Sequence, residues 1–242
     1  NTAVGLGAAL SLTIGSNNVA IGKDALQDCV IHNENTAVGQ NALADNVASH
    51  NTAVGYNAGS SVTTGVQNTI IGSEAGDALT TGSRNVVLGY GALSNEDGHG
   101  RNIAIGYNAL NVQNAGADAY NIAIGYGVAA SISTGTHNTL IGGFAGDALT
   151  TGHSNVVLGY GALSAEVAGR KNIAVGYRAL NVQNNDADNY NVAVGYDAGL
   201  NVTTGIKNTL IGGLAGSALT SGGENVAIGY AALISETANG RN

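Results

Sequence analysis

The stretch NTAVG at Asn1–Gly5 returns at Asn35 and at Asn51, and variants such as NVAIG, NIAIG and NTLIG fill most of the intervals between. The residue numbers of successive copies differ by 17 in most intervals, by 19 in two and by 16 in one. A nearly constant period is typical of a solenoid. We therefore predict a single repeat domain over residues 1–242. Its 14 complete coils, with lengths from 16 to 19, start at Asn1, Asn18, Asn35, Asn51, Asn68, Asn85, Asn102, Asn121, Asn138, Asn155, Asn172, Asn191, Asn208 and Asn225.

Each repeat, numbered from its Asn as position 1, has the composition of a short strand. Position 2 is Thr, Val or Ile, position 4 is Val, Ile or Leu, and position 5 is Gly in every complete copy. β-Branched residues suit strands, and glycine permits a sharp corner. Six coils carry a further segment of this kind, such as SVTTG from Ser61 and ALTTG from Ala78, which predicts a second strand. The pattern indicates an all-β parallel β-solenoid, or β-roll, with roughly 4.8 Å per coil.

Both faces of the predicted strand are apolar. Side chains alternate along a strand, so positions 2 and 4 share one face and position 3, mostly Ala, takes the other. We expect position 4 to point into the coil, so that aspartate at Val54 or Ile105 would bury a charge. Position 8, Ala in all coils but that of Val128, is also expected inside. The alanine face then suits close approach of a second chain, which predicts an oligomer.

The repeat asparagine has a structural explanation. At a coil corner its amide can donate to and accept from the copies above and below, forming a ladder that fixes the register. We predict this ladder for all 14 copies. A residue repeated so often is poorly suited to a catalytic or glycan-binding role.

A longer period lies above the coil, since the residue numbers of Asn51, Asn121 and Asn191 rise in equal steps of four coils. Blocks such as DALTTG, at Asp77 and at Asp147, are identical in successive copies of this four-coil unit. Duplication lengthens an array without creating a single active site. It favours a spacer or a multivalent surface.

Composition excludes several classes of protein. The formal net charge is −8 with only eight Lys and Arg, which argues against nucleic acid as a partner. Five of these cations directly precede a repeat Asn, which indicates a solvated corner: Arg84, Arg101, Lys171, Lys207 and Arg241. No apolar run approaches the roughly 18 residues of a membrane span, so no membrane insertion is predicted for this segment. The single Cys29 cannot form an internal disulfide.

Aromatic residues form the clearest candidate for ligand binding. A column of rings could bind sugar faces or could pack as a ladder against a corner or a neighbouring chain, and we favour packing. Tyrosine occupies position 6 in eight coils, as Tyr56, Tyr90, Tyr107, Tyr126, Tyr160, Tyr177, Tyr196 and Tyr230.

The polar residues give no metal, cofactor or catalytic motif. The histidines are distributed over different coils, as His32, His50, His99, His137 and His153. Asp186 and Asp188 could bind calcium, although a solvated acidic loop is the favoured interpretation. Glu96 and Asp97 are adjacent, but paired carboxylates of a glycosidase need a defined separation across a substrate. We predict no catalytic residue, no cofactor, no metal and no enzyme activity.

The motifs NVAIG at Asn18 and Asn225, NIAIG at Asn102 and Asn121, and NVAVG at Asn191 resemble the N-S-V-A-I-G repeat of trimeric autotransporter adhesin heads. Similar NTAIG-type arrays are found in bacteriophage tail fibres. The resemblance implies a left-handed parallel β-roll in a homotrimer, located outside the cell on a cell surface or virion. It also implies attachment to a host-cell, matrix or glycan receptor. The coil here is longer than that of the adhesin head.

These observations lead to one function and two alternatives. The first is a rigid extracellular fibre segment, an adhesin head or the shaft of a receptor-binding fibre, without catalysis. The alternatives are an ice- or crystal-binding solenoid and a glycan-cleaving phage tailspike. An ice-binding face would need an uninterrupted array of regularly spaced threonines, whereas the Thr-pair segments are interrupted every two coils.

Overall fold

The chain divides into two compact units, Asn1–Tyr120 and Asn121–Asn242, which we call the N-terminal and C-terminal units. A computed structural model describes residues 1–241. Every secondary-structure element in the described part is a three-residue strand, one per coil. The N-terminal unit contains β1 (Thr2–Val4), β2 (Val19–Ile21), β3 (Thr36–Val38), β4 (Thr52–Val54), β5 (Thr69–Ile71), β6 (Val86–Leu88) and β7 (Ile103–Ile105). The C-terminal unit contains β8 (Ile122–Ile124), β9 (Thr139–Ile141), β10 (Val156–Leu158), β11 (Ile173–Val175), β12 (Val192–Val194), β13 (Thr209–Ile211) and β14 (Val226–Ile228).

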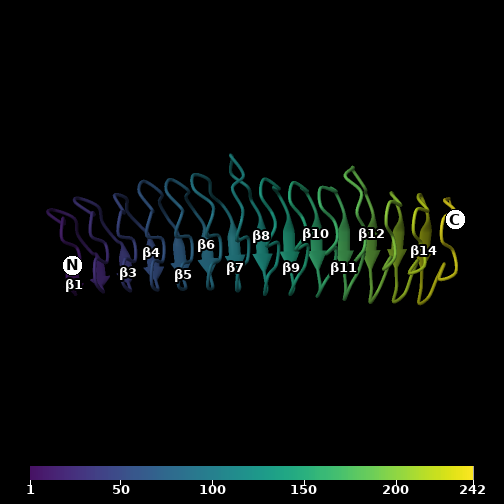
Figure 1. Cartoon of the computed structure of the whole chain (residues 1–242), viewed down its shortest axis with the longest axis horizontal. Coiled ribbons are helices and arrows are strands. Elements are labelled where there is room, and N and C mark those ends of the chain that lie inside the picture. Colours follow the sequence, from purple (N-terminus) through teal and green to yellow (C-terminus); the bar gives the residue numbers. More distant parts are fainter. Residues whose placement is uncertain (242) are drawn as a thin grey trace. The chain divides into compact units, whose positions relative to one another are not determined.

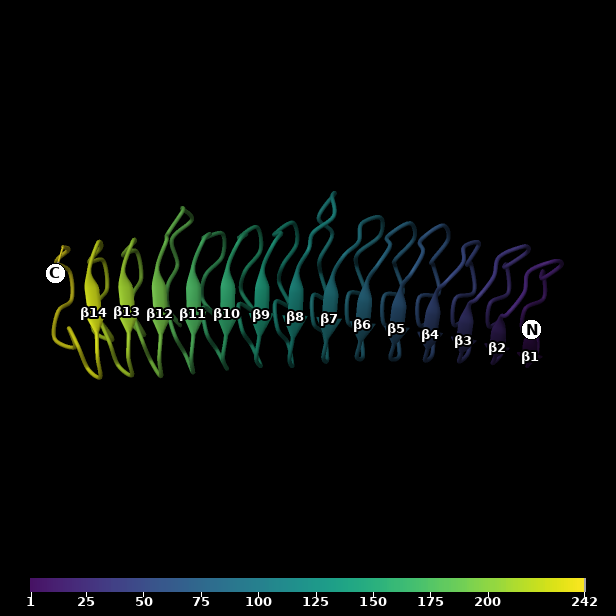
Figure 2. The same ribbon diagram turned by 180° about the vertical axis from the view of Figure 1, so that it is seen from behind.

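Within each unit, consecutive strands pair in parallel and in chain order. Equivalent positions of successive repeats face each other, as in Val156 opposite Thr139 and Val157 opposite Leu140. The strands of each unit lie side by side, and the rest of every coil consists of turns (Figures 1 and 2). The predicted all-β parallel solenoid, with one coil of nearly constant length per repeat, is confirmed.

The predicted second strand is wrong, because the Thr-pair segments form turns and bends. In one such coil, Asn57 and Gly59 have φ angles of 54° and 56°, so the chain is still turning when it reaches Ser61. Successive Thr-pair segments nevertheless hydrogen-bond to each other, since Thr63 N donates to Thr80 O at 2.8 Å. The coil therefore has one regular strand and a hydrogen-bonded, irregular return path.

The two faces of the strand are the reverse of the prediction. Position 3 is buried in every strand from β2 to β14, whereas positions 2 and 4 are half-exposed or exposed. Val54 and Ile105 thus lie on the outer face. The alternation itself was predicted correctly, but alanine marks the narrow interior of the coil and not a contact with another chain. Position 8 also points inward as expected, including Val128.

Large and small side chains alternate inside the coil. Leu140 at position 3 and Leu149 at position 12 are fully buried beside Gly146. A Cβ on Gly146 would lie 2.7 Å from Leu140 Cδ2 and 2.8 Å from Leu149 Cδ1, so glycine leaves room for both leucines. One coil later Leu163 replaces the glycine and the smaller Val157 replaces Leu140. A larger residue at position 3 is thus matched by glycine at position 9, and a smaller one by leucine, which keeps the interior closely packed.

The glycine that ends each strand is required by two independent features. Gly159 has a φ of +143°, which L-residues with a side chain rarely adopt, and a Cβ there would lie 2.2 Å from the carbonyl oxygen of Gly176 in the next coil. The same contact recurs between Gly89 and Gly106 in the N-terminal unit. Neighbouring coils can therefore approach at the strand spacing only if position 5 has no side chain.

Candidate functional site

Most of the repeat asparagines form side-chain hydrogen bonds in two directions at the start of their strands. All are buried except Asn1. Asn51 is representative, because its Oδ1 accepts from the backbone N–H of Asn68 at 3.0 Å and its Nδ2 donates to Gly65 O at 2.7 Å. The first bond links successive coils and the second closes the asparagine's own coil. Asn172, at the start of one of the two longest coils, has no hydrogen-bond partner for its side-chain atoms within residues 1–241.

The eight tyrosines at position 6 are exposed, and several rings stack on one another. Tyr160 and Tyr177 have centroids 5.8 Å apart and planes 11° apart, and Tyr177 and Tyr196 have centroids 5.2 Å apart and planes 10° apart. Phe144 meets Tyr160 edge to face. In these stacks each ring lies against the ring of the next coil, which reduces the ring surface that is open to a flat ligand. This arrangement favours the packing interpretation over a stack of sugar-binding plates.

The outer strand face is a regular, partly apolar feature of each unit. It consists of the side chains at positions 2 and 4, which are Thr, Val, Ile or Leu throughout. Leu88 is 43% exposed and Ile173 is 39% exposed, and neither lies at the end of its unit. Soluble monomers rarely expose long contiguous apolar patches, so this face is a candidate interaction surface.

A polar layer interrupts the interior at position 12. This position repeats every four coils as two aliphatic residues, a glutamate and a glutamine, namely Val62, Leu79, Glu96 and Gln113 in the N-terminal unit and Ile132, Leu149, Glu166 and Gln183 in the C-terminal unit. The Glu166 side chain is fully buried and accepts hydrogen bonds from Gly169 N at 2.9 Å, Gln183 Nε2 at 3.0 Å and Asn189 Nδ2 at 3.1 Å. Burial nevertheless raises the pKa of Glu166.

Glu166→Gln is expected to become more stable relative to the parent as pH rises. The folded pKa of Glu166 lies above its ordinary value of 4.5, so the folded chain binds this proton more tightly than the unfolded chain. The free energy of unfolding therefore falls as pH rises from 4.5 through the folded pKa, and glutamine removes that loss. Guanidinium unfolding of both proteins between about pH 4 and pH 8 measures the difference.

The exposed Glu224 provides a control of opposite sign. A hydrogen bond from Arg241 lowers the pKa of Glu224, so this carboxylate contributes stability above its ordinary pKa that is lost as pH falls. Glu224→Gln should therefore lose stability relative to the parent as pH rises. If the stability of both variants relative to the parent changed with pH in the same direction, the opposite pKa shifts given to Glu166 and Glu224 would be contradicted.

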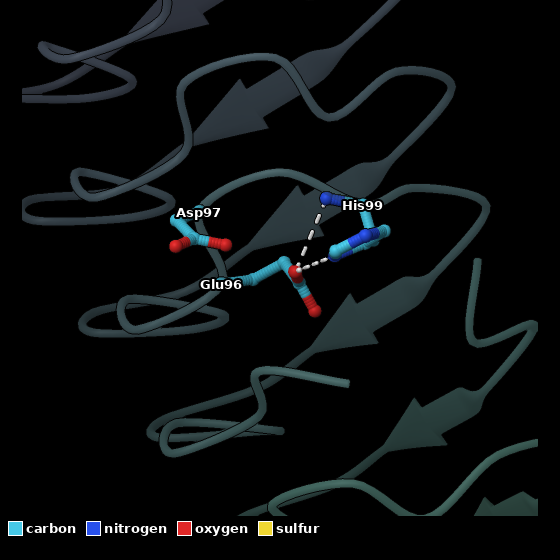
Figure 3. A group of neighbouring side chains, drawn as sticks. All are labelled: Glu96, Asp97 and His99. Carbon is cyan, nitrogen blue, oxygen red and sulfur yellow. Dashed lines mark hydrogen bonds and ion pairs between the residues drawn. The ribbon is translucent and has the colours of Figure 1, made fainter. Parts of the chain in front are cut away.

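In the N-terminal unit the equivalent buried glutamate lies beside a histidine and a second carboxylate (Figure 3). Glu96 is fully buried, and its Oε1 accepts from the backbone N–H of His99 at 3.2 Å. The same Oε1 lies 3.4 Å from His99 Nδ1. Glu96 Oε2 and His99 Nδ1 have no hydrogen-bond partner among the described residues. The potential ligand atoms of Glu96, Asp97 and His99 all lie within 4.8 Å of one another.

The acidic loop residue Asp188 is engaged by a cation. Lys171 Nζ donates to Asp188 Oδ2 at 2.6 Å and to the Tyr190 hydroxyl at 2.8 Å, and the first hydrogen bond lowers the pKa of Asp188. Arg101 bonds the equivalent Asp118 in the N-terminal unit. These contacts reduce support for calcium at Asp186 and Asp188. They also place two of the five corner cations beside partners from the following coil.

The position-12 layer and the Glu96 cluster were missed from sequence. The signal for the layer is present, since Glu96, Glu166 and Glu236 recur once in every four coils and each occupies position 12. The approach of His99 to Glu96 depends on a turn whose course the repeat does not specify.

Comparisons of the chain with protein-family models, with curated proteins and with solved structures found no match. The likeness to adhesin heads and tail fibres therefore rests on the repeat motif alone. Within residues 1–241, no helix is long and apolar enough to cross a bilayer.

Proposed function

We propose that this chain is a rigid fibre segment that associates with copies of itself through its outer strand face. The observation that carries the proposal is position 4, which is Val, Ile or Leu in all 14 coils although its side chain lies outside the coil. Interior packing does not explain this uniformity. Burial of these side chains against another chain explains it, because removing apolar surface from water stabilises an assembly by about 25 cal/mol for each Å².

The proposed assembly is a homotrimer in which three outer faces meet along a common axis. The repeat motif resembles that of trimeric adhesin heads, and the continuous apolar strips of β-branched residues suit a dry, repetitive interface. On a cell surface or virion such a segment would serve as an adhesin head or as the shaft of a receptor-binding fibre. The alanine face has no part in this contact, since it fills the coil.

Light scattering on the intact chain tests the assembly. We expect three times the mass of one chain for the parent and a single-chain mass for the double variant Leu88→Lys, Leu158→Lys. Both substitutions place a charge at position 4 of equivalent coils, where desolvation on association would be costly. Far-ultraviolet circular dichroism should show that the double variant keeps its strands.

The matched control is Thr81→Lys, Thr151→Lys, which adds the same charges to exposed positions of equivalent turns. This control should keep the mass of the parent. A single-chain mass for the parent at high micromolar concentration would refute the proposed assembly.

Binding to an ordered solid such as ice is the second candidate. It is favoured by Thr36, Thr52 and Thr69, which lie in register at position 2 of β3, β4 and β5 on the outer face. Valine or isoleucine replaces threonine at this position in β6, β7 and β8, so the threonine array is short. A thermal-hysteresis assay separates the two candidates, because a fibre segment should give no hysteresis.

Glycan cleavage has less support than either. Glu96 and Asp97 are the adjacent carboxylates, yet the Glu96 side chain has no accessible surface. A general acid must reach the glycosidic oxygen of its substrate, which this burial prevents. Incubation with surface polysaccharide and an assay for new reducing ends would test the alternative.

A further inference from the structure

We infer that Glu96, Asp97 and His99 bind one divalent transition-metal ion of the zinc type. The three side chains supply two carboxylates and one imidazole, a ligand set that suits such ions. Calcium, which prefers oxygen ligands only, is a poor match for a site containing His99. The inference is independent of the fibre proposal, since the cluster lies in the turns and not on the outer strand face.

The first argument is the unsatisfied pair of buried atoms. A fully buried carboxylate oxygen without a donor is costly, and Glu96 Oε2 is such an atom within the described residues. His99 Nδ1 also has no hydrogen-bond partner there, although it lies 3.4 Å from Glu96 Oε1. Two ligands at about 2.0–2.2 Å from one tetrahedral zinc ion are separated by roughly 3.4 Å. Glu96 Oε1 and His99 Nδ1 therefore have the spacing of two atoms that share an ion, and the unpartnered Oε2 belongs to the same carboxylate.

The second argument is the equivalent site four coils later. There, side-chain amides of the protein donate hydrogen bonds to the buried carboxylate of Glu166. Glu166 receives a hydrogen bond from Asn189 Nδ2 at 3.1 Å. The residue equivalent to Asn189 in the N-terminal unit is Ala119, which has no amide to donate. The residues equivalent to Gly169 and Val167 are His99 and Asp97. The N-terminal unit thus lacks this amide donor to its buried carboxylate, although the backbone N–H of His99 still donates to Glu96 Oε1, and it has two added metal ligands beside the carboxylate.

The third argument is charge. Two ionised carboxylates and a neutral imidazole carry a charge of −2, which a divalent cation neutralises. Glu96 is buried on the inner side of the site, while Asp97 is exposed, and a ligand atom of Asp97 lies within 4.8 Å of those of Glu96 and His99. Figure 3 shows the Glu96 and His99 side chains directed toward each other, with Asp97 on the same turn. Water would complete a four-coordinate shell.

The test is zinc binding by the intact chain, followed by calorimetry and by the visible absorption of bound cobalt. We expect one ion per chain and a rise in melting temperature with zinc concentration. His99→Gly should weaken zinc binding at least tenfold and abolish the tetrahedral cobalt spectrum. Glycine is tolerated at the equivalent position 169, so this variant should fold.

Ala119→Asn is a second variant that leaves all three ligands in place. It introduces the amide that bonds the glutamate in the other unit, so it should stabilise the metal-free chain and weaken zinc binding at least tenfold. The control is His153→Ser, because serine occupies the equivalent position 83 and His153 lies in a different coil from the cluster. Its zinc affinity should equal that of the parent.

Three results would overturn the inference. They are the absence of saturable zinc binding up to about 1 mM, binding by His99→Gly or Ala119→Asn as tight as that of the parent, and an equal loss of binding in His153→Ser. Because none of these measurements depends on oligomer mass, failure here leaves the fibre proposal untouched.

Discussion

Leu140→Asp is expected to be the most destabilising of the substitutions considered, lowering the free energy of unfolding by about 4–5 kcal/mol. Leu140 is fully buried at position 3 of β9, where its side chain fills the space left by Gly146. Aspartate removes the apolar contacts and introduces a charge without a partner. Guanidinium unfolding followed by circular dichroism measures the loss, which is large enough to unfold several neighbouring coils.

The neighbouring residue of the same strand provides the control. Ile141 lies on the outer face and is half-exposed, so Ile141→Asp should cost about 1 kcal/mol in the isolated chain. Both experiments belong at dilute protein concentration, because association through the outer face would add to the cost at Ile141. Equal destabilisation by the two substitutions would contradict the assignment of the strand faces.

Gly159→Ala is expected to cost about 3 kcal/mol or more, an unusually large effect for the addition of one methyl group. The residue has a φ of +143°, and the added Cβ would lie 2.2 Å from Gly176 O. The contact is with backbone, so relief requires the two coils to separate and weakens the strand pairing between β10 and β11. Thermal unfolding measures the effect.

A substitution in the preceding coil, Gly143→Ala, is the control. It adds the same methyl group at a position where the backbone of the next coil does not crowd it. Gly143 does not have a positive φ, and a Cβ there would lie 3.4 Å from Tyr160 Cδ2 and 3.8 Å from Tyr126 O, which are ordinary contact distances. Gly143→Ala should change the melting temperature little. A similar loss in both variants would mean that the strand-ending glycine is not specially constrained.

The fold class was predictable because the strand signal repeats. A three-residue strand is too short to identify alone, but copies at a constant spacing identify both the strand and its partner. The choice of inner face was not predictable from apolarity, since position 3 and position 4 are both apolar. Residue size was the informative signal, because the interior is narrow enough to favour alanine at Ala53 and to require glycine beside Leu140.

The candidate metal site was harder to predict than the fold. Glu96 and His99 are three residues apart in sequence, and the repeat consensus does not specify the course of the loop that brings their side chains together. The difference from the second copy was nevertheless present in the sequence, since Ala119 stands where the duplicate has Asn189. Comparison of the two copies residue by residue would have identified this position as a change in hydrogen-bonding capacity.

The buried layer at position 12 limits how the length of this chain can change. Adding or removing four consecutive coils in the regular part of the array leaves Glu96 and Glu166 next to a glutamine and leaves Leu79 and Leu149 next to an aliphatic residue. Removing a single coil changes the residue that packs against the buried carboxylate. For example, removal of the coil that contains Leu149 would place Glu166 next to Ile132. Natural length variants should therefore differ in steps of four coils.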